Sequence, residues 1–159
     1  MPTLMITSDD QMKKLGYRLG ETARPNDLLL LCGDLGAGKT TLTKGLASAL
    51  GIRRPVKSPT FTIVREYREG KLPLFHMDMY RLEKDGDLAS IDLPAYLTAG
   101  GVTVIEWPQF IMSQLPDQAL TLTLRRTDDT WDSTQRRVLI RPHGSRANSW
   151  WQEVEQKNG

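Results

Sequence analysis

A short segment in the first third of the chain has the residue types and spacing of a phosphate-binding loop. Gly33 is followed, after four residues, by Gly38, Lys39 and Thr40, which fits the pattern G-x-x-x-x-G-K-[ST]. Glycines let the backbone curl, so that successive N–H groups and the start of the next helix can face a phosphate. Lys39 would then bridge the β- and γ-phosphates of a nucleoside triphosphate, and the Thr40 hydroxyl would bind Mg²⁺.

Two acidic residues follow apolar segments and are candidates for the metal site and for hydrolysis. Glu106 comes directly after the apolar residues 102–105, where a phosphate loop needs a carboxylate to hold Mg²⁺. The alternative is that Glu106 only ends a strand. Asp78 ends a second candidate strand and would orient or deprotonate the attacking water if that strand lies beside the first. His76 would share a face with Asp78, where a packed or surface histidine is the more common role.

A third candidate is the segment of residues 58–61, Ser-Pro-Thr-Phe, which connects the loop's helix to the next strand. Many nucleotide hydrolases keep a segment here that senses the γ-phosphate. Thr60 would offer its hydroxyl to Mg²⁺ or to that phosphate. An ordinary loop would also contain such residues, so both interpretations stay open at this point.

Apolar periodicity predicts the elements that would position these residues. Strands alternating with helices predict an α/β fold with a mainly parallel central sheet, in a three-layer, P-loop NTPase-like architecture. Two late segments that alternate around a polar turn predict an antiparallel edge. The predicted helices cover residues 7–19, 39–50 and 87–98, and the predicted strands cover residues 27–32, 61–67, 74–79, 102–105, 119–125 and 135–141.

Length and composition indicate one globular domain. The chain has 159 residues, of which 39% are hydrophobic and 25% charged, a balance typical of soluble proteins. We expect a single domain over residues 1–159, with a core over about residues 27–141 and a tail over residues 142–159. The longest apolar run, residues 28–32, is far too short for a membrane helix. We therefore expect a cytoplasmic protein with no membrane partner.

The basic residues give only a weak indication of a partner. A net charge of +2 is too small to predict nucleic-acid binding by itself. Arg125, Arg126, Arg136 and Arg137 cluster in the predicted antiparallel pair, and we interpret such arginines mainly as solvated surface. Trp150 and Trp151, in the tail, are expected to belong to a packed terminal helix rather than to a contact surface.

Four segments, taken in order, resemble the TsaE family, also called YjeE. They are residues 33–41, 57–62, 76–82 and 104–108, which contain the loop, Ser-Pro-Thr-Phe, His-Met-Asp-Met-Tyr-Arg-Leu and Val-Ile-Glu-Trp-Pro. The resemblance spans about residues 27–108, and four motifs in order are much more specific than the loop alone. Met77 and Met79 depart from the bulkier apolar or aromatic residues common in the family, and no motif matches from Arg125 onward.

The resemblance implies an ATPase of the bacterial pathway that forms threonylcarbamoyladenosine in tRNA, acting on the TsaD–TsaB complex. It implies ATP and Mg²⁺ as ligands, Thr40 and Glu106 as metal ligands, and catalytic roles for Lys39, Asp78 and Thr60. A direct contact with tRNA stays open. The implied nucleotide-binding residues are Gly33, Asp34, Gly36, Ala37, Gly38, Lys39, Thr40, Thr41, Trp107 and, at the start of the first helix, Asp9, which an ordinary helix cap explains equally well.

Two other functions remain open for a chain with this loop. One is a small-molecule kinase, which needs an acceptor pocket and usually lid arginines. The other is a protein that uses ATP only as an assembly signal, without essential hydrolysis. The sequence has no Asn-Lys-x-Asp segment of the kind that reads guanine, which favours ATP over GTP.

Overall fold

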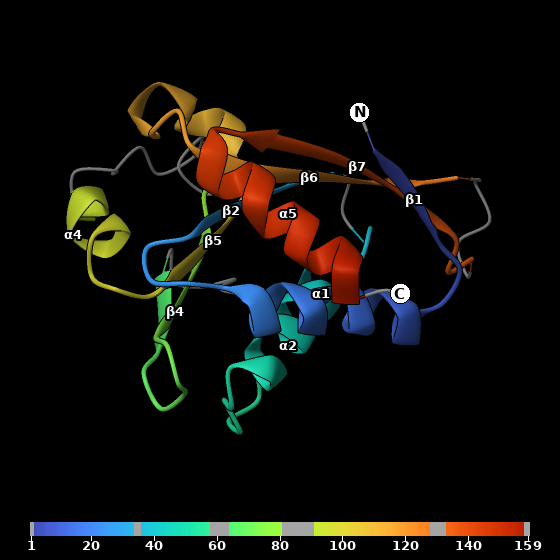
Figure 1. Ribbon diagram of the computed structural model, residues 1–159, viewed down its shortest axis with the longest axis horizontal. Helices are drawn as coiled ribbons and strands as arrows, with labels where there is room; N and C mark the ends of the chain where they lie inside the picture. Colours follow the sequence, from blue (N-terminus) through green and yellow to red (C-terminus); the bar gives the residue numbers. More distant parts are fainter. Residues whose placement is uncertain (1, 34–35, 58–63, 81–90, 128–132, 158–159) are drawn as a thin grey trace.

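A computed structural model of the chain describes residues 2–33, 36–57, 64–80, 91–127 and 133–157 (Figure 1). Asp34, Thr60 and residues 87–90 of the segment predicted as a helix over residues 87–98 lie outside these ranges. The elements are β1 (Thr3–Ile6), α1 (Asp9–Thr22), β2 (Leu28–Gly33), α2 (Lys39–Ala49), β3 (Val64–Tyr67), β4 (Leu74–Asp78), α4 (Leu93–Leu97), β5 (Val102–Glu106), the 3-10 turns η2 (Pro108–Phe110) and η3 (Met112–Gln114), β6 (Ala119–Arg126), β7 (Arg136–His143) and α5 (Ser145–Lys157).

The described strands form one mixed sheet of seven strands in the order β1-β7-β6-β2-β5-β4-β3. Strand β2 runs parallel to both β5 and β6, and β4 runs parallel to β5. The pairs β3–β4, β6–β7 and β1–β7 are antiparallel. The predicted α/β fold with a parallel centre is therefore confirmed, and the predicted antiparallel pair is β6–β7. Strand β1, which the sequence did not predict, continues this side of the sheet beyond β7.

Helices cover both faces of the sheet, as the predicted three layers require. Helices α1, α2 and α5 lie together on one side of it (Figure 1) and share a hydrophobic core with alternate strand residues such as Leu29, Leu31 and Val104. The opposite face of the central strands, with Leu28, Leu30 and Phe75 among its residues, packs against α4 and the segment around Ile111. Burial on both faces explains why β2 reads as a continuous apolar run.

The core is wider than the predicted range of residues 27–141. Leu15 and Leu19 of α1, and Trp150, Trp151 and Val154 of α5, belong to the same buried cluster as the central strands. The segment expected as a tail is therefore mostly a packed helix, and its two tryptophans pack as expected. Among the described residues, no helix is both long enough and apolar enough to span a bilayer.

Helix α1 fixes the position of α2 through a very close contact. A Cβ atom added to Gly45 of α2 would lie 2.0 Å from the Lys13 carbonyl oxygen of α1, a separation that no side chain can accommodate. Glycine at this position therefore permits the two helices to approach closely. Because α2 is the helix that follows the phosphate loop, this contact also helps to position the loop. Helix α1 begins at Asp9, because Ser8 is its N-cap and accepts a hydrogen bond from the Gln11 N–H.

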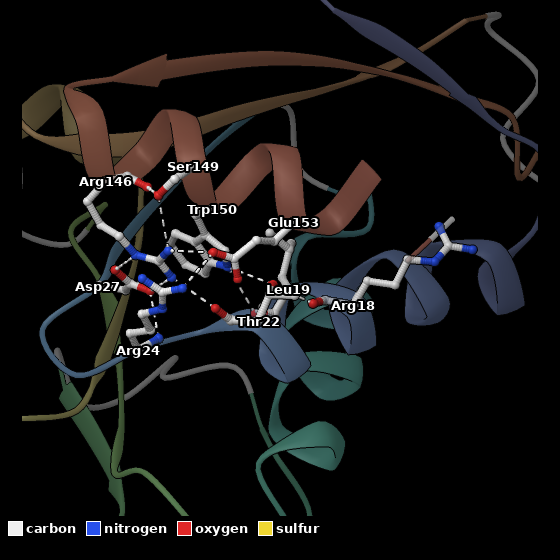
Figure 2. Close-up of polar contacts among 9 residues, drawn as sticks. All are labelled: Arg18, Leu19, Thr22, Arg24, Asp27, Arg146, Ser149, Trp150 and Glu153. Atoms are coloured by element: carbon white, nitrogen blue, oxygen red, sulfur yellow. Dashed lines mark hydrogen bonds and ion pairs between the residues drawn. The ribbon is translucent and has the colours of Figure 1, made fainter. Parts of the chain in front are cut away.

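Helix α5 is held at the start of β2 by an ion pair between Arg146 and the buried carboxylate of Asp27. The Arg146 guanidinium donates to both Asp27 carboxylate oxygens, at 2.9 and 2.8 Å, and to the Thr22 carbonyl oxygen at 2.9 Å (Figure 2). The Trp150 indole N–H reaches the Leu19 carbonyl oxygen and the Thr22 hydroxyl, both at 3.1 Å. Because Asp27 directly precedes β2, these contacts connect α1, α5 and the central strand.

We expect Arg146→Ala to lower the free energy of unfolding by about 3 kcal/mol, because it leaves the buried Asp27 carboxylate without its charged partner. Asp27 exposes only 3% of its side chain. Arg24→Ala is the matched control, because Arg24 also pairs with Glu153 but is 61% exposed, and it should cost less than about 1 kcal/mol. Urea denaturation of both variants measures the difference, and equal losses would contradict the assigned role of the Asp27 pair.

Candidate functional site

A cavity of about 260 Å³ opens at the carboxyl ends of β4 and β5, beside the amino end of α2. This edge of a parallel sheet is where α/β proteins usually bind ligands. A larger cavity of about 670 Å³ lies between β3 and α4 and contains none of the predicted site residues. The smaller cavity is lined by Asp9, Gly36, Gly38, Lys39, Thr40, Thr41, Asp78, Glu106, Trp107 and Arg136.

The described part of the phosphate loop has the backbone conformation that its glycines predict. Gly38 is the N-cap of α2 and has φ of +103°, in the left-handed region. A Cβ atom at this position would also lie 3.1 Å from the terminal methyl of Met12, so a side chain would be strained and crowded. Helix α2 therefore begins at the cavity, where Thr40 and Thr41 belong to its first turn. The first N–H groups of a helix have no acceptor within the helix, and together with the positive end of the helix dipole they favour an anion there.

Lys39 is 5% exposed and its ammonium group is held within the site. Nζ donates a hydrogen bond to the Gly33 carbonyl oxygen at 2.7 Å and lies 4.0 Å from the centre of the Trp107 ring. Trp107 has φ of +57°, which is uncommon for a non-glycine residue, and its ring also lies beside that of Tyr80, at 5.0 Å between centres. The backbone turn after β5 thus aims an aromatic face at the lysine.

The two predicted acids end neighbouring parallel strands. Asp78 and Glu106 are register partners in the β4–β5 pair, and both line the cavity. Burial raises the pKa of the Asp78 carboxyl, and the nearby Glu106 charge acts in the same direction, while a hydrogen bond from the Tyr80 N–H at 3.0 Å opposes it. A carboxyl group with a raised pKa accepts a proton more readily, as a group that handles an attacking water must.

The donor set fits Mg²⁺ better than a metal held by protein alone. Among the described residues, no group of three histidine, cysteine or acidic side chains is arranged to hold a metal ion. Thr40 and Glu106 instead offer one hydroxyl and one carboxylate at the same cavity. Mg²⁺ typically takes one or two such ligands and completes its shell with water and phosphate oxygens. The site can therefore hold this ion together with a phosphate ligand.

Arg136 is a site residue that the sequence analysis missed. It is 9% exposed and donates to the carbonyl oxygens of Ser133, Gln135 and Gly36, at 2.8, 2.8 and 3.1 Å. The interpretation of this arginine as solvated surface is therefore wrong. The reason is topological, because β6 lies parallel to β2 and brings its partner strand β7 to the loop. Local sequence carries no signal for that pairing.

The structure brings together most of the predicted site residues. The cavity is lined by Asp9 at the start of α1, by Gly36 and Gly38 of the loop, by Lys39, Thr40 and Thr41 of α2, and by Asp78, Glu106 and Trp107 at the ends of β4 and β5. Gly33 contributes the carbonyl oxygen that binds Lys39, whereas the Ala37 side chain is buried in the hydrophobic core. Asp34 and Thr60 fall outside the described residues, so their roles remain predictions.

Comparison with known proteins gives one consistent family. The model of the family described as "Threonylcarbamoyl adenosine biosynthesis protein TsaE" matches residues 6–138. A protein of Bacillus subtilis named tRNA threonylcarbamoyladenosine biosynthesis protein TsaE is 46% identical over 120 residues, which cover 76% of this chain and 75% of the relative. A protein of the same name from Streptomyces coelicolor is 41% identical over 140 residues, covering 85% of this chain and 93% of the relative.

A solved structure agrees over nearly the whole length. The crystal structure of YdiB from Bacillus subtilis superposes with a TM-score of 0.85 at 35% sequence identity, covering 99% of this chain and 96% of the other. The agreement includes β1 and α5, which lie outside the four motifs. The chain therefore belongs to the TsaE family, whose role is in the biosynthesis of threonylcarbamoyladenosine in tRNA.

Proposed function

We propose that this chain binds Mg-ATP at the cavity at the amino end of α2 and hydrolyses it in a cycle coupled to the TsaD–TsaB complex. One observation carries the proposal. Lys39, Thr40, Asp78 and Glu106, which come from three different elements, line one cavity at the carboxyl ends of parallel strands. A turn that only connected a strand to a helix would not require this combination of a lysine, a hydroxyl and two acids.

Each of these residues has a role in nucleotide binding or hydrolysis that follows from its position. The N–H groups at the start of α2 bind phosphate oxygens, and Lys39 exchanges its hydrogen bond with the Gly33 carbonyl for one with a phosphate oxygen. Glu106 and Thr40 would hold Mg²⁺, which would supply positive charge to offset the charge of the phosphates. Asp78, whose carboxyl is partly buried, positions the attacking water and receives its proton. Charge stabilisation and positioning are the main contributions expected for phosphoryl transfer.

A requirement for ATP turnover distinguishes this proposal from an ATP-dependent assembly role. An assembly factor needs nucleotide binding but no turnover, so a variant that binds ATP without hydrolysing it would still support modification. A hydrolase in a cycle would support only a limited number of rounds in that form. The distinction depends on separating binding from turnover at Lys39 and Asp78.

Two variants separate these steps. Lys39→Ala should lower ATP affinity and turnover, because the phosphates lose their cationic partner. Asp78→Asn should keep ATP affinity within about threefold and lower TsaD–TsaB-stimulated turnover by about 100-fold, because the amide cannot accept the proton. Calorimetry with Mg-ATP measures the affinity, and phosphate release measures the turnover. The yield of modified tRNA is the third quantity to be measured for each variant.

Lys44→Ala is the matched control, because Lys44 is an exposed lysine on the same helix. It should leave all three quantities unchanged. Unchanged ATP affinity and turnover in Lys39→Ala would contradict the proposed site. Full multi-round tRNA modification by Asp78→Asn would contradict hydrolysis and favour the assembly role.

Arg136→Ala should weaken Mg-ATP binding by about tenfold, because the loss of three hydrogen bonds frees Gly36 and the turn before β7. The adjacent exposed arginine, Arg137, is the second residue of the same strand and gives the control Arg137→Ala, which should bind as the unmodified chain does. Fluorescence titration with a labelled ATP analogue measures both affinities. Equal affinities of the two variants would contradict a role for Arg136 in holding the loop.

A further inference from the structure

A fully buried histidine lies directly against the proposed metal ligand. His76 of β4 is 0% exposed, and its Nε2 lies 2.5 Å from Oε2 of Glu106, whose side chain is 5% exposed. Because an ionised carboxylate can only accept hydrogen bonds, this contact is a hydrogen bond in the tautomer that carries the hydrogen on Nε2. Among the described residues, Nδ1 has no hydrogen-bond partner. The contact with Glu106 is therefore the hydrogen bond that the His76 ring makes among the described residues.

The strand register places this contact below the site. His76 is paired with Val104, and Asp78 is paired with Glu106, so His76 approaches Glu106 diagonally from one step deeper in the sheet. The residues of β4 and β5 on the same face are Leu74, Val102 and Val104, which belong to the main hydrophobic core. The pair therefore lies between an apolar core and the cavity that Glu106 lines.

If only the stability of the fold mattered, an apolar side chain at position 76 would be expected to serve as well as or better than histidine. Burying a polar pair costs desolvation, and replacing such a pair by packed hydrophobic residues is often neutral or stabilising. A role for His76 confined to packing would not explain why the imidazole is aligned with one carboxylate oxygen. Fixing that carboxylate explains it, because one oxygen is engaged by His76 and Oε1 is left for a ligand in the cavity.

We propose that His76 is a positioning residue, which holds the Glu106 carboxylate in the orientation that binds Mg²⁺. The inference rests on the proposed Mg-ATP site and adds a residue to it. Carboxylate ligands of metals are commonly oriented by a hydrogen bond from a second residue, and loss of that residue lowers metal affinity by about 10- to 100-fold. His76 itself does not touch the nucleotide or the metal in this arrangement.

The test compares metal affinity with nucleotide affinity. In His76→Leu, the donor is lost while a similar volume remains, and the apparent Mg²⁺ dissociation constant for binding a labelled ATP analogue should rise about 10- to 100-fold. Binding of the same analogue in EDTA should stay within about twofold. His76→Gln can place an amide N–H where Nε2 lies, and it should restore Mg²⁺ affinity to within about threefold. Mn²⁺ titration followed by electron paramagnetic resonance gives the same comparison without turnover.

His143 provides the matched control, because it is an exposed histidine at the end of β7. His143→Leu should leave both affinities unchanged. Long-range ¹H–¹⁵N NMR of the metal-free chain gives a second readout that does not require the leucine variant to fold. It should show His76 protonated at Nε2, with a resonance that moves in Glu106→Gln.

Three results would overturn the inference. They are an unchanged Mg²⁺ dependence in a folded His76→Leu chain, an equal loss of affinity with and without metal, and a His76 resonance that lacks the Nε2 proton. If the unmodified chain binds no Mg-nucleotide, the proposed function fails and this role fails with it. If that chain binds Mg-nucleotide normally and His76→Leu does too, only the inference about His76 fails.

Discussion

A charged ammonium group held away from water is the constraint on which the site depends. Lys39 exposes only 5% of its surface, and a buried charge is tolerated only when polar or aromatic groups surround it. The Gly33 carbonyl oxygen and the Trp107 ring meet part of this requirement. Both partners have positive φ, +135° for Gly33 and +57° for Trp107. The turns that end β2 and β5 therefore both have backbone conformations that place a partner beside the Lys39 ammonium group.

Strand β2 connects the site to the neighbouring strands and to the helices. It lies between β5 and β6, parallel to both, so β5 and β6 each end beside the phosphate loop. Strand β5 supplies Glu106, and β6 brings Arg136 through its pairing with β7. At the other end of β2, the Asp27–Arg146 pair connects the strand to α1 and α5 (Figure 2). The central strand is thus fixed at both ends by charged contacts and along its length by apolar packing.

Much of this could be predicted from sequence because the signals are local. The apolar run before Gly33, the spacing of Lys39 and Thr40, and the acids that end β4 and β5 each follow from a few consecutive residues. What sequence reasoning missed depends on pairing between distant segments. Strand β1 has four residues with little alternation, Arg136 reaches the loop only through the β6–β7 register, and His76 meets Glu106 thirty positions along the chain.

The predictions for the last third of the chain show the same division. The β6–β7 pair was predictable from alternation around a polar turn, but its place next to β2 was not. A packed terminal helix could be expected from the two tryptophans, but the place where α5 packs could not, since its bonds to Leu19 and Thr22 join segments more than 120 residues apart. Close packing in such a core arises only when the layers are assembled. It therefore cannot be predicted from the sequence of any single segment.

The most direct test of the account is a crystal structure of the chain with Mg²⁺ and a non-hydrolysable ATP analogue. We expect the β- and γ-phosphates at the N–H groups that begin α2, and the Lys39 ammonium hydrogen-bonded to a phosphate oxygen instead of the Gly33 carbonyl. Glu106 should lie in the coordination sphere of Mg²⁺, directly or through water. A nucleotide in the cavity between β3 and α4, or a Lys39 still bound to Gly33 beside an occupied site, would contradict the account.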